Sequence, residues 1–197
     1  MIAVAEPTLA KPGAGLPFIE WFVANYILMP RMLHRSTRQT AINQFTREAE
    51  RIKTLASALN PEELTERKLI KRLTGLEDSS RYWSVAMTMQ HLVIVNTGIR
   101  ATVIDLCNGG TDRPKAQVQD VKPSAEVNGE VIRSEFEVMC KKFLHTAETA
   151  KVEAHPEATF DHPWFGPFNA QDWLAMAGFH QKIHRTQIEA IIYQLSR

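Results

Sequence analysis

The segment FHQKIHRTQ, residues 179–187, carries two histidines, His180 and His184, four residues apart. Apolar residues around them recur at steps of three and four, which is typical of a helix with one buried face. Side chains four residues apart on a helix project from the same face, so both imidazoles should point into the interior. The expected stripe consists of Trp173, Ala177, His180, His184, Ile188 and Ile191.

A third histidine, His91, lies on the interior stripe of another predicted helix, between Met87 and Ile94. Neighbouring helix axes in a bundle are about 8–10 Å apart, so a ring from one helix can meet two from another. Without a metal, each buried ring would need a polar partner or leave an unsatisfied group that costs roughly 1–3 kcal/mol. We therefore predict a divalent metal site formed by His91, His180 and His184.

Gln187, one turn after His184, could orient a histidine ring or a ligand by a hydrogen bond, or could be a polar residue at the edge of the stripe. An H-E-x-x-H metalloprotease needs a glutamate as general base directly after its first histidine. Gln181 occupies that position, which disfavours protease chemistry. His162, in the motif DHPWFGP, is expected to pack within its loop and not to bind the metal.

Composition excludes several other classes. The chain has 197 residues, a net charge of +1 and 44% hydrophobic residues, so one soluble domain is expected, without a field that recruits nucleic acid. The locally basic segment 31–72 is interpreted as a solvated helix face. Cys107 and Cys140 form no disulfide framework, which favours a reducing, cytoplasmic location. The apolar run FIEWFVANYILM is too short to span a bilayer, so we expect it to pack against a helix and predict no stable membrane insertion.

The elements that must position the histidines are all predicted to be helical, because no useful stretch alternates with the period of two that marks a strand. A flexible leader over residues 1–16 precedes one domain over residues 17–197. A capping box is expected at Asn60 with Glu63 and another at Asn169 with Asp172. The first predicted helix spans residues 17–29 and is ended by Pro30, and the second spans residues 35–59. The third runs from residue 78 or 79 to a stop at Gly109-Gly110 and is followed by a polar linker at residues 110–128. The last two span residues 129–153 and residue 169 to nearly 197.

Together these motifs resemble the DinB/YfiT-like superfamily. The resemblance is carried by Trp83-Ser84 followed by His91-Leu92, by the stretch HPWFGPFNAQDW, and by H-x-x-x-H-x-x-Q at residues 180–187. It is best over residues 76–197. It implies an all-α, up-and-down four-helix bundle, here with an extra N-terminal helix and a long crossover linker, in which His91, His180 and His184 hold the metal.

The resemblance also implies that the metal is zinc or nickel, with iron possible, and that two copies pair as a homodimer. Characterised members of the superfamily include thiol S-transferases and a thiol-dependent isomerase. Because three protein nitrogens leave an open position, an entering thiol would be held there as the nucleophilic thiolate. We therefore expect a thiol-dependent S-transferase that acts on a small electrophile.

Two alternatives stay open. A water in the same position could act in hydrolysis, although no carboxylate is obviously placed in the sequence as its general base. The protein could instead be a non-enzymatic, stress-associated metal-binding module. Its partner surface would then be the apolar helix at residues 18–29 or the aromatic loop with Trp164, Phe165 and Phe168.

Overall fold

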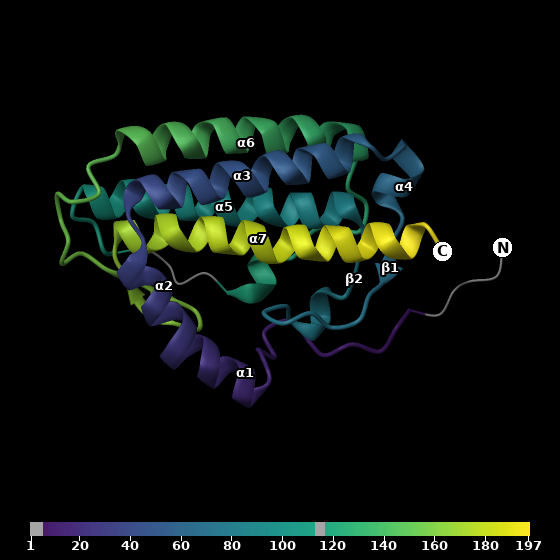
Figure 1. Ribbon diagram of the computed structural model, residues 1–197, viewed down its shortest axis with the longest axis horizontal. Coiled ribbons are helices and arrows are strands. Elements are labelled where there is room, and N and C mark those ends of the chain that lie inside the picture. The colour runs from purple at the N-terminus through teal and green to yellow at the C-terminus, as the bar shows by residue number, and fades with distance from the viewer. Residues whose placement is uncertain (1–5, 113–116) are drawn as a thin grey trace.

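Four long helices form the body of the protein (Figure 1). The computed structural model describes residues 6–112 and 117–197. This architecture confirms the predicted all-α class and four-helix bundle. The bundle helices are α3 (Arg38–Ser57), α5 (Val85–Cys107), α6 (Gly129–Thr149) and α7 (Ala170–Leu195).

Each bundle helix packs against two others: α7 lies against α3 and α5, and α6 contacts the same two helices. Arg38 at the start of α3 donates a hydrogen bond to the carbonyl of Ala147 at the end of α6, so these two helices are antiparallel. Helices α5 and α6 run in the same direction (Figure 1). The reason is the crossover linker between them, which returns the chain to the end of the bundle where α5 began.

The core consists of the apolar stripes that the helical spacing predicts. The rings of Phe45 on α3 and Phe143 on α6 stack with centroids 4.2 Å apart, and both are fully buried. On α7, Gly178 permits close contact with α3, since a Cβ there would lie 3.2 Å from the backbone nitrogen of Phe45. This contact fixes the height and rotation of α7, and with them the direction in which its histidines point.

Both predicted capping boxes form. The Asn169 side chain accepts a hydrogen bond from the backbone N–H of Asp172, whose carboxylate accepts one from the backbone N–H of Asn169. Asn60 and Glu63 make the same reciprocal pair at the start of the short helix α4 (Pro61–Thr65). The cap residue Asn169, 11 residues before His180, defines where α7 begins.

The prediction that Pro30 ends the N-terminal helix is wrong. The chain stays helical through α1 (Phe18–Val23), the π-helical segment η1 (Ala24–Leu28) and α2 (Met29–Arg35). Proline lacks the N–H of a regular helical hydrogen bond, and a π-type turn directly before it lets the helical chain continue. This N-terminal helical segment leaves the bundle and projects below it (Figure 1).

The expectation that the fold contains no strands is also wrong. Two antiparallel pairs form, β1 (Lys68–Leu69) with β2 (Tyr82–Trp83), and β3 (Phe160–His162) with β4 (Gly166–Phe168). Strands of two or three residues are too short to show an alternating pattern. Two helix boundaries also differ from the prediction. Helix α5 begins after the cap residue Ser84, because residues 78–80 form a separate 3₁₀ turn, η2, and α6 ends at Thr149.

The leader and the crossover linker are only partly described. Residues 1–5 and 113–116 lie outside the described residues. Within the leader, the backbone N–H groups of Gly13 and Gly15 donate hydrogen bonds to the carboxylate of Glu77. Within the linker, residues 118–121 form a 3₁₀ turn, η3. Among the described residues, we find no helix with the length and apolar character needed to cross a membrane.

Candidate metal centre

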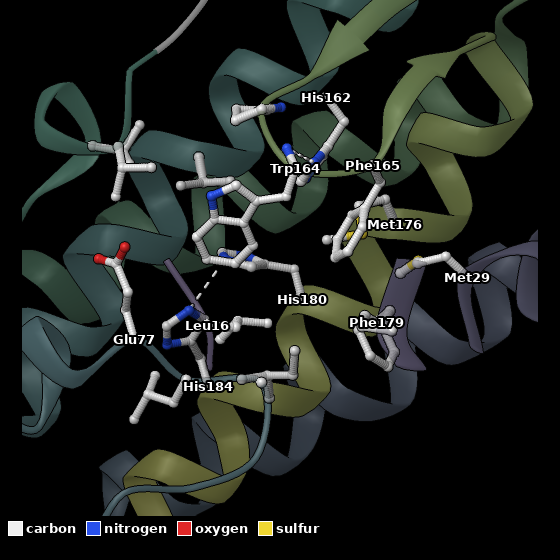
Figure 2. Close-up of a pocket in the computed structure, with 18 of the residues that line it drawn as sticks. Leu16, Met29, Glu77, His162, Trp164, Phe165, Met176, Phe179, His180 and His184 are labelled. Carbon is white, nitrogen blue, oxygen red and sulfur yellow. Dashed lines mark hydrogen bonds between the residues drawn. The ribbon is translucent and has the colours of Figure 1, made fainter. Parts of the chain in front are cut away.

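The structure brings the three predicted histidines to one point. His91 comes from α5, and His180 and His184 come from successive turns of α7. The Nε2 atom of His180 lies 3.3 Å from Nε2 of His91 and 3.1 Å from Nε2 of His184 (Figure 2 shows the α7 pair). One candidate ligand atom from each ring lies within 4.8 Å of the other two. The geometric expectation from the sequence is thus confirmed.

Two of the three rings are held by hydrogen bonds at their outer nitrogens. Nδ1 of His91 lies 2.8 Å from the carbonyl oxygen of Val121, in η3 of the crossover linker. Nδ1 of His184 lies 2.7 Å from Oε1 of Gln187, whose amide nitrogen donates to the carbonyl of Ser80. Since a carbonyl oxygen only accepts, each Nδ1 carries the proton and each Nε2 presents a lone pair to the shared point.

This arrangement fits a cation. The lone pairs on Nε2 of His91 and Nε2 of His184 both face Nε2 of His180. A neutral His180 can donate at most one proton from that atom, so at least one of the two lone pairs has no hydrogen to accept. Nδ1 of His180 is buried and has no hydrogen-bond partner among the described residues. Ligands of a tetrahedral ion with metal–nitrogen bonds of 2.0–2.1 Å lie about 3.3 Å apart, close to the two separations observed. The three histidines can therefore hold a metal ion.

Burial keeps the rings in the neutral form that binds metals. It lowers the pKa of His91 to about 4, although the hydrogen bond to Val121 partly offsets the effect. Burial also lowers the pKa of His180 and that of His184 well below the usual value, and the neighbouring imidazoles lower both further. At neutral pH no ring needs to lose a proton before it coordinates an ion.

Trp83 forms one wall of the centre. Its ring stacks on His184 with centroids 6.2 Å apart and an interplanar angle of 9°, and its centroid lies 5.2 Å from that of His91. The sequence placed Trp83 on a helix, whereas the structure places it in β2, where it pairs with Lys68 of β1. This strand holds the indole against the histidines.

A cavity of about 950 Å³ opens in front of the histidines (Figure 2). Helices α5 and α7 form its floor, the N-terminal helical segment and the leader form one side, and the β3–β4 hairpin and η3 form the other. Trp164 and Phe165 of the hairpin face this space together with His180 and His184. The rings of the centre are thus exposed to a chamber that can admit a small molecule.

Three carboxylates line the cavity, those of Glu20, Glu77 and Asp161, and each is engaged within the chain. Asp161 lies in β3, whereas Glu20 and Glu77 hold the N-terminal part of the chain. Glu77 accepts hydrogen bonds from Gly13, Gly15 and Ser79 at 2.8–3.2 Å. Glu20 pairs with Arg72 and accepts a hydrogen bond from the backbone of Gly75. They fasten the leader and the N-terminal helical segment over the cavity.

His162 has the packing role that the sequence favoured. Its ring stacks on Phe165 with centroids 4.8 Å apart, and its Nδ1 accepts a hydrogen bond from the backbone of Trp164. Burial lowers its pKa to about 3. Phe168, part of the aromatic surface considered for a partner, is buried, while Phe18 and Ile19 on α1 are exposed.

The fold and the centre define a class: four-helix bundles in which inward histidines from two helices form a potential metal site. Residues 44–188 match the DinB superfamily, and the chain belongs to this superfamily. The resemblance stated from the sequence motifs is confirmed. No curated protein matches the sequence significantly.

Two solved structures are similar to this fold. A mycothiol-dependent maleylpyruvate isomerase has a TM-score of 0.63 at 14% identity, over 80% of this chain and 63% of the isomerase. The four-helix bundle protein TT2238 has a TM-score of 0.57 at 19% identity, over 78% of this chain and 98% of that protein. The chain thus spans less than two thirds of the isomerase, and the shared part is the fold.

Proposed function

We propose that this protein is a divalent-metal-dependent enzyme that transfers a small thiol to an electrophile. The observation that carries the proposal is the convergence of His91, His180 and His184 at the floor of an open cavity. Three neutral imidazoles suit zinc or nickel, with iron also possible. When bound, such an ion supplies positive charge that favours the thiolate form of an entering thiol.

The chain's own residues supply orientation and exclusion of water. The carbonyl of Val121 and the amide of Gln187 fix the rings of His91 and His184. Trp83 covers one side of the rings, so a substrate approaches from the cavity. In the transfer, sulfur forms a bond to an electrophilic carbon, the thiol proton goes to solvent, and the displaced group leaves with its bonding electron pair.

Thiol transfer is favoured over hydrolysis because a hydrolase needs a general base for water. The carboxylates of Glu20 and Glu77, which line the cavity, already accept hydrogen bonds from other parts of the chain, and the third lining carboxylate, Asp161, is engaged within the chain as well. The similarity of the fold to a mycothiol-dependent isomerase is consistent with thiol chemistry. The small-molecule thiol and electrophile, the homodimer and the cytoplasmic location remain predictions.

The test is turnover by tag-free protein reloaded separately with zinc, nickel or iron. A panel of low-molecular-weight thiols is combined with 1-chloro-2,4-dinitrobenzene and other uncharged electrophiles, and the thioether product is measured. Metal-dependent thioether formation, abolished in His184→Ala, is expected. Ester or amide cleavage without any thiol-dependent product would replace this proposal with the hydrolase.

A further inference from the structure

Gly98 is an unusual residue for its position in the middle of α5. Glycine within a helix costs about 0.5–1 kcal/mol relative to alanine. A close packing contact would explain it, yet a Cβ built at Gly98 meets no atom within 4 Å. Gly98 lines the cavity in front of the histidines. Its missing side chain widens the cavity and has no role in packing the helices.

The wall around this space is largely apolar. Its side chains come from α5, from α7 and from the β3–β4 hairpin, so separate parts of the chain contribute the same chemistry. Trp164 and Phe165 face the same space as His180 and His184 (Figure 2). The residues that define this wall include Val95, Ile99, Met176, Phe179, Trp164 and Phe165.

The charged groups of the wall are poorly placed to bind a charged ligand. The carboxylates of Glu20 and Glu77 are occupied by donors from the chain, and the third lining carboxylate, Asp161, is exposed to solvent and also engaged within the chain. Among the described residues that line the cavity, Lys182 is the only lysine or arginine, and its side chain is exposed to solvent. A buried anionic or cationic substrate would therefore lack a compensating partner in the apolar part of the cavity.

We propose that this cavity binds the electrophile of the reaction, and that the electrophile is a largely apolar, uncharged molecule of aromatic or aliphatic character. Its body lies along Gly98 and the apolar wall, with its reactive atom at the histidine end. A cavity of about 950 Å³ is large enough for a drug-sized ligand. The assignment of this molecule as the electrophile rests on the proposed thiol transfer, whereas its binding does not.

The probe is N-phenyl-1-naphthylamine, an uncharged fluorophore whose emission rises in an apolar environment. Titration of the metal-loaded full-length protein should give saturable binding of one probe per chain. Gly98→Phe places a ring in the open space at residue 98 and should weaken binding at least tenfold. Gly98→Ala adds only a Cβ and should bind nearly as well as the original chain. Val138→Phe, a matched substitution at an exposed position of α6, should leave binding unchanged.

Metal content separates this proposal from the proposed function. Gly98→Phe should retain its metal while losing the probe. If it misfolds or loses metal, Ile94→Trp provides a second way to fill the cavity. The proposal is overturned if the original chain shows no saturable binding of the probe. It is also overturned if Gly98→Phe and Ile94→Trp both bind the probe as tightly as the original chain does. If the protein binds the probe but transfers a thiol to no apolar electrophile, the proposed binding site stands and the proposed transferase function is refuted.

Discussion

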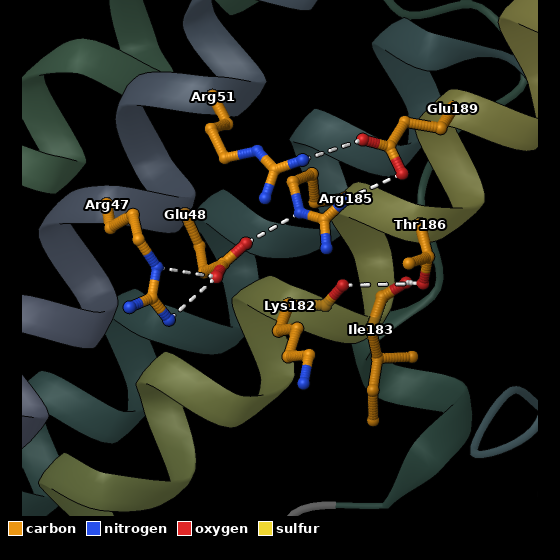
Figure 3. A network of polar contacts seen from close by, with 8 residues as sticks. All are labelled: Arg47, Glu48, Arg51, Lys182, Ile183, Arg185, Thr186 and Glu189. Carbon is orange, nitrogen blue, oxygen red and sulfur yellow. Dashed lines mark hydrogen bonds and ion pairs between the residues drawn. The ribbon is translucent and has the colours of Figure 1, made fainter.

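Helix α7 carries two buried polar clusters on different sides. The histidine cluster consists of His91, His180, His184 and Gln187, and it faces α5 and the cavity. The ion-pair cluster faces α3 (Figure 3). In it, Arg185 Nε donates to Glu48 Oε2 at 2.6 Å, and both side chains are almost fully buried. The ion-pair cluster consists of Arg47, Glu48, Arg51, Arg185 and Glu189.

The two clusters differ in how they satisfy their polar atoms. Glu48 receives Arg185 on one oxygen and Arg47 on the other, and Arg185 also pairs with Glu189. Each buried charge therefore has an opposite charge within the chain. The histidine cluster instead brings like groups together, with two lone pairs directed at the same ring.

This difference separates a cluster that is complete within the chain from one that could hold an ion. A buried ion pair that is complete within the chain joins α3 to α7 and needs nothing from outside. A cluster of converging acceptors is incomplete without a proton or a cation. The candidate metal site is therefore recognised by what its own residues leave unsatisfied, as much as by the residue types.

The largest effect is expected from His184→Ala. It removes one of three ligands, and loss of even a hydrogen-bond partner behind a ligand costs about 10–100-fold in metal affinity. We expect a loss of more than about 100-fold, measured by elemental analysis and competition with a chromophoric chelator on tag-free protein. His91→Ala and His180→Ala should behave in the same way. Unchanged metal content would refute the assignment of ligands.

Glu48→Gln tests the ion-pair cluster. The change keeps the size of the side chain but removes the charge opposite Arg185, so the free energy of unfolding in urea should fall by about 2–3 kcal/mol. Metal content should stay the same, because no ligand is touched. A loss of metal as large as in His184→Ala would show that the two clusters are not independent.

Acid should remove the contribution of Glu48. Burial raises the pKa of its carboxyl, but hydrogen bonds from Arg185 and Arg47 outweigh this, and the pKa lies below its ordinary value. A carboxyl with a lowered folded-state pKa stabilises the fold above its unfolded pKa of about 4.3, and this is lost as pH falls further. The difference in unfolding free energy between the original chain and Glu48→Gln should therefore be constant at pH 6–7 and shrink below about pH 4. A constant difference down to pH 3 would contradict this.

Gln187 and Gln181 allow a matched comparison on one helix. Both are fully buried, but Gln187 bonds His184 and Ser80, while both amide atoms of Gln181 lack a hydrogen-bond partner among the described residues. Gln187→Leu should weaken metal binding by about 10–100-fold. Gln181→Leu should leave metal affinity unchanged and stability equal or higher. Equal metal affinities in the two variants would remove the orienting role of Gln187.

The sequence predicted the convergence of the three histidines because their signal is periodic. The spacing on two helices placed three histidines on interior stripes, and helix packing brought them together. The groups that hydrogen-bond to these histidines from behind could not be predicted in this way. The partners of His91 and Gln187 are the backbone carbonyls of Val121 and Ser80, which have no residue signature and depend on how a linker and a turn pack.

The ion-pair cluster was missed for a different reason. Glu48 lies in the segment interpreted as a solvated helix face, and Arg185 follows a histidine of the stripe. Both are buried because α7 is covered by α3 on one side and by α5 on another. A single stripe of apolar residues predicts only one buried face of a helix. Charged side chains that are buried on a second face are therefore interpreted as surface residues.

The smallest effect is expected at the edge of the ion-pair cluster. Arg51 Nη2 lies 3.3 Å from Glu189 Oε1, with the two side chains 52% and 38% exposed. An exposed pair is screened by water and salt, so Arg51→Ala should lower the free energy of unfolding by less than about 1 kcal/mol. The measurement is urea unfolding beside Glu48→Gln at low and high salt. Equal losses in the two variants would mean that the cluster acts as one unit, and that burial of the Glu48–Arg185 pair does not set its strength.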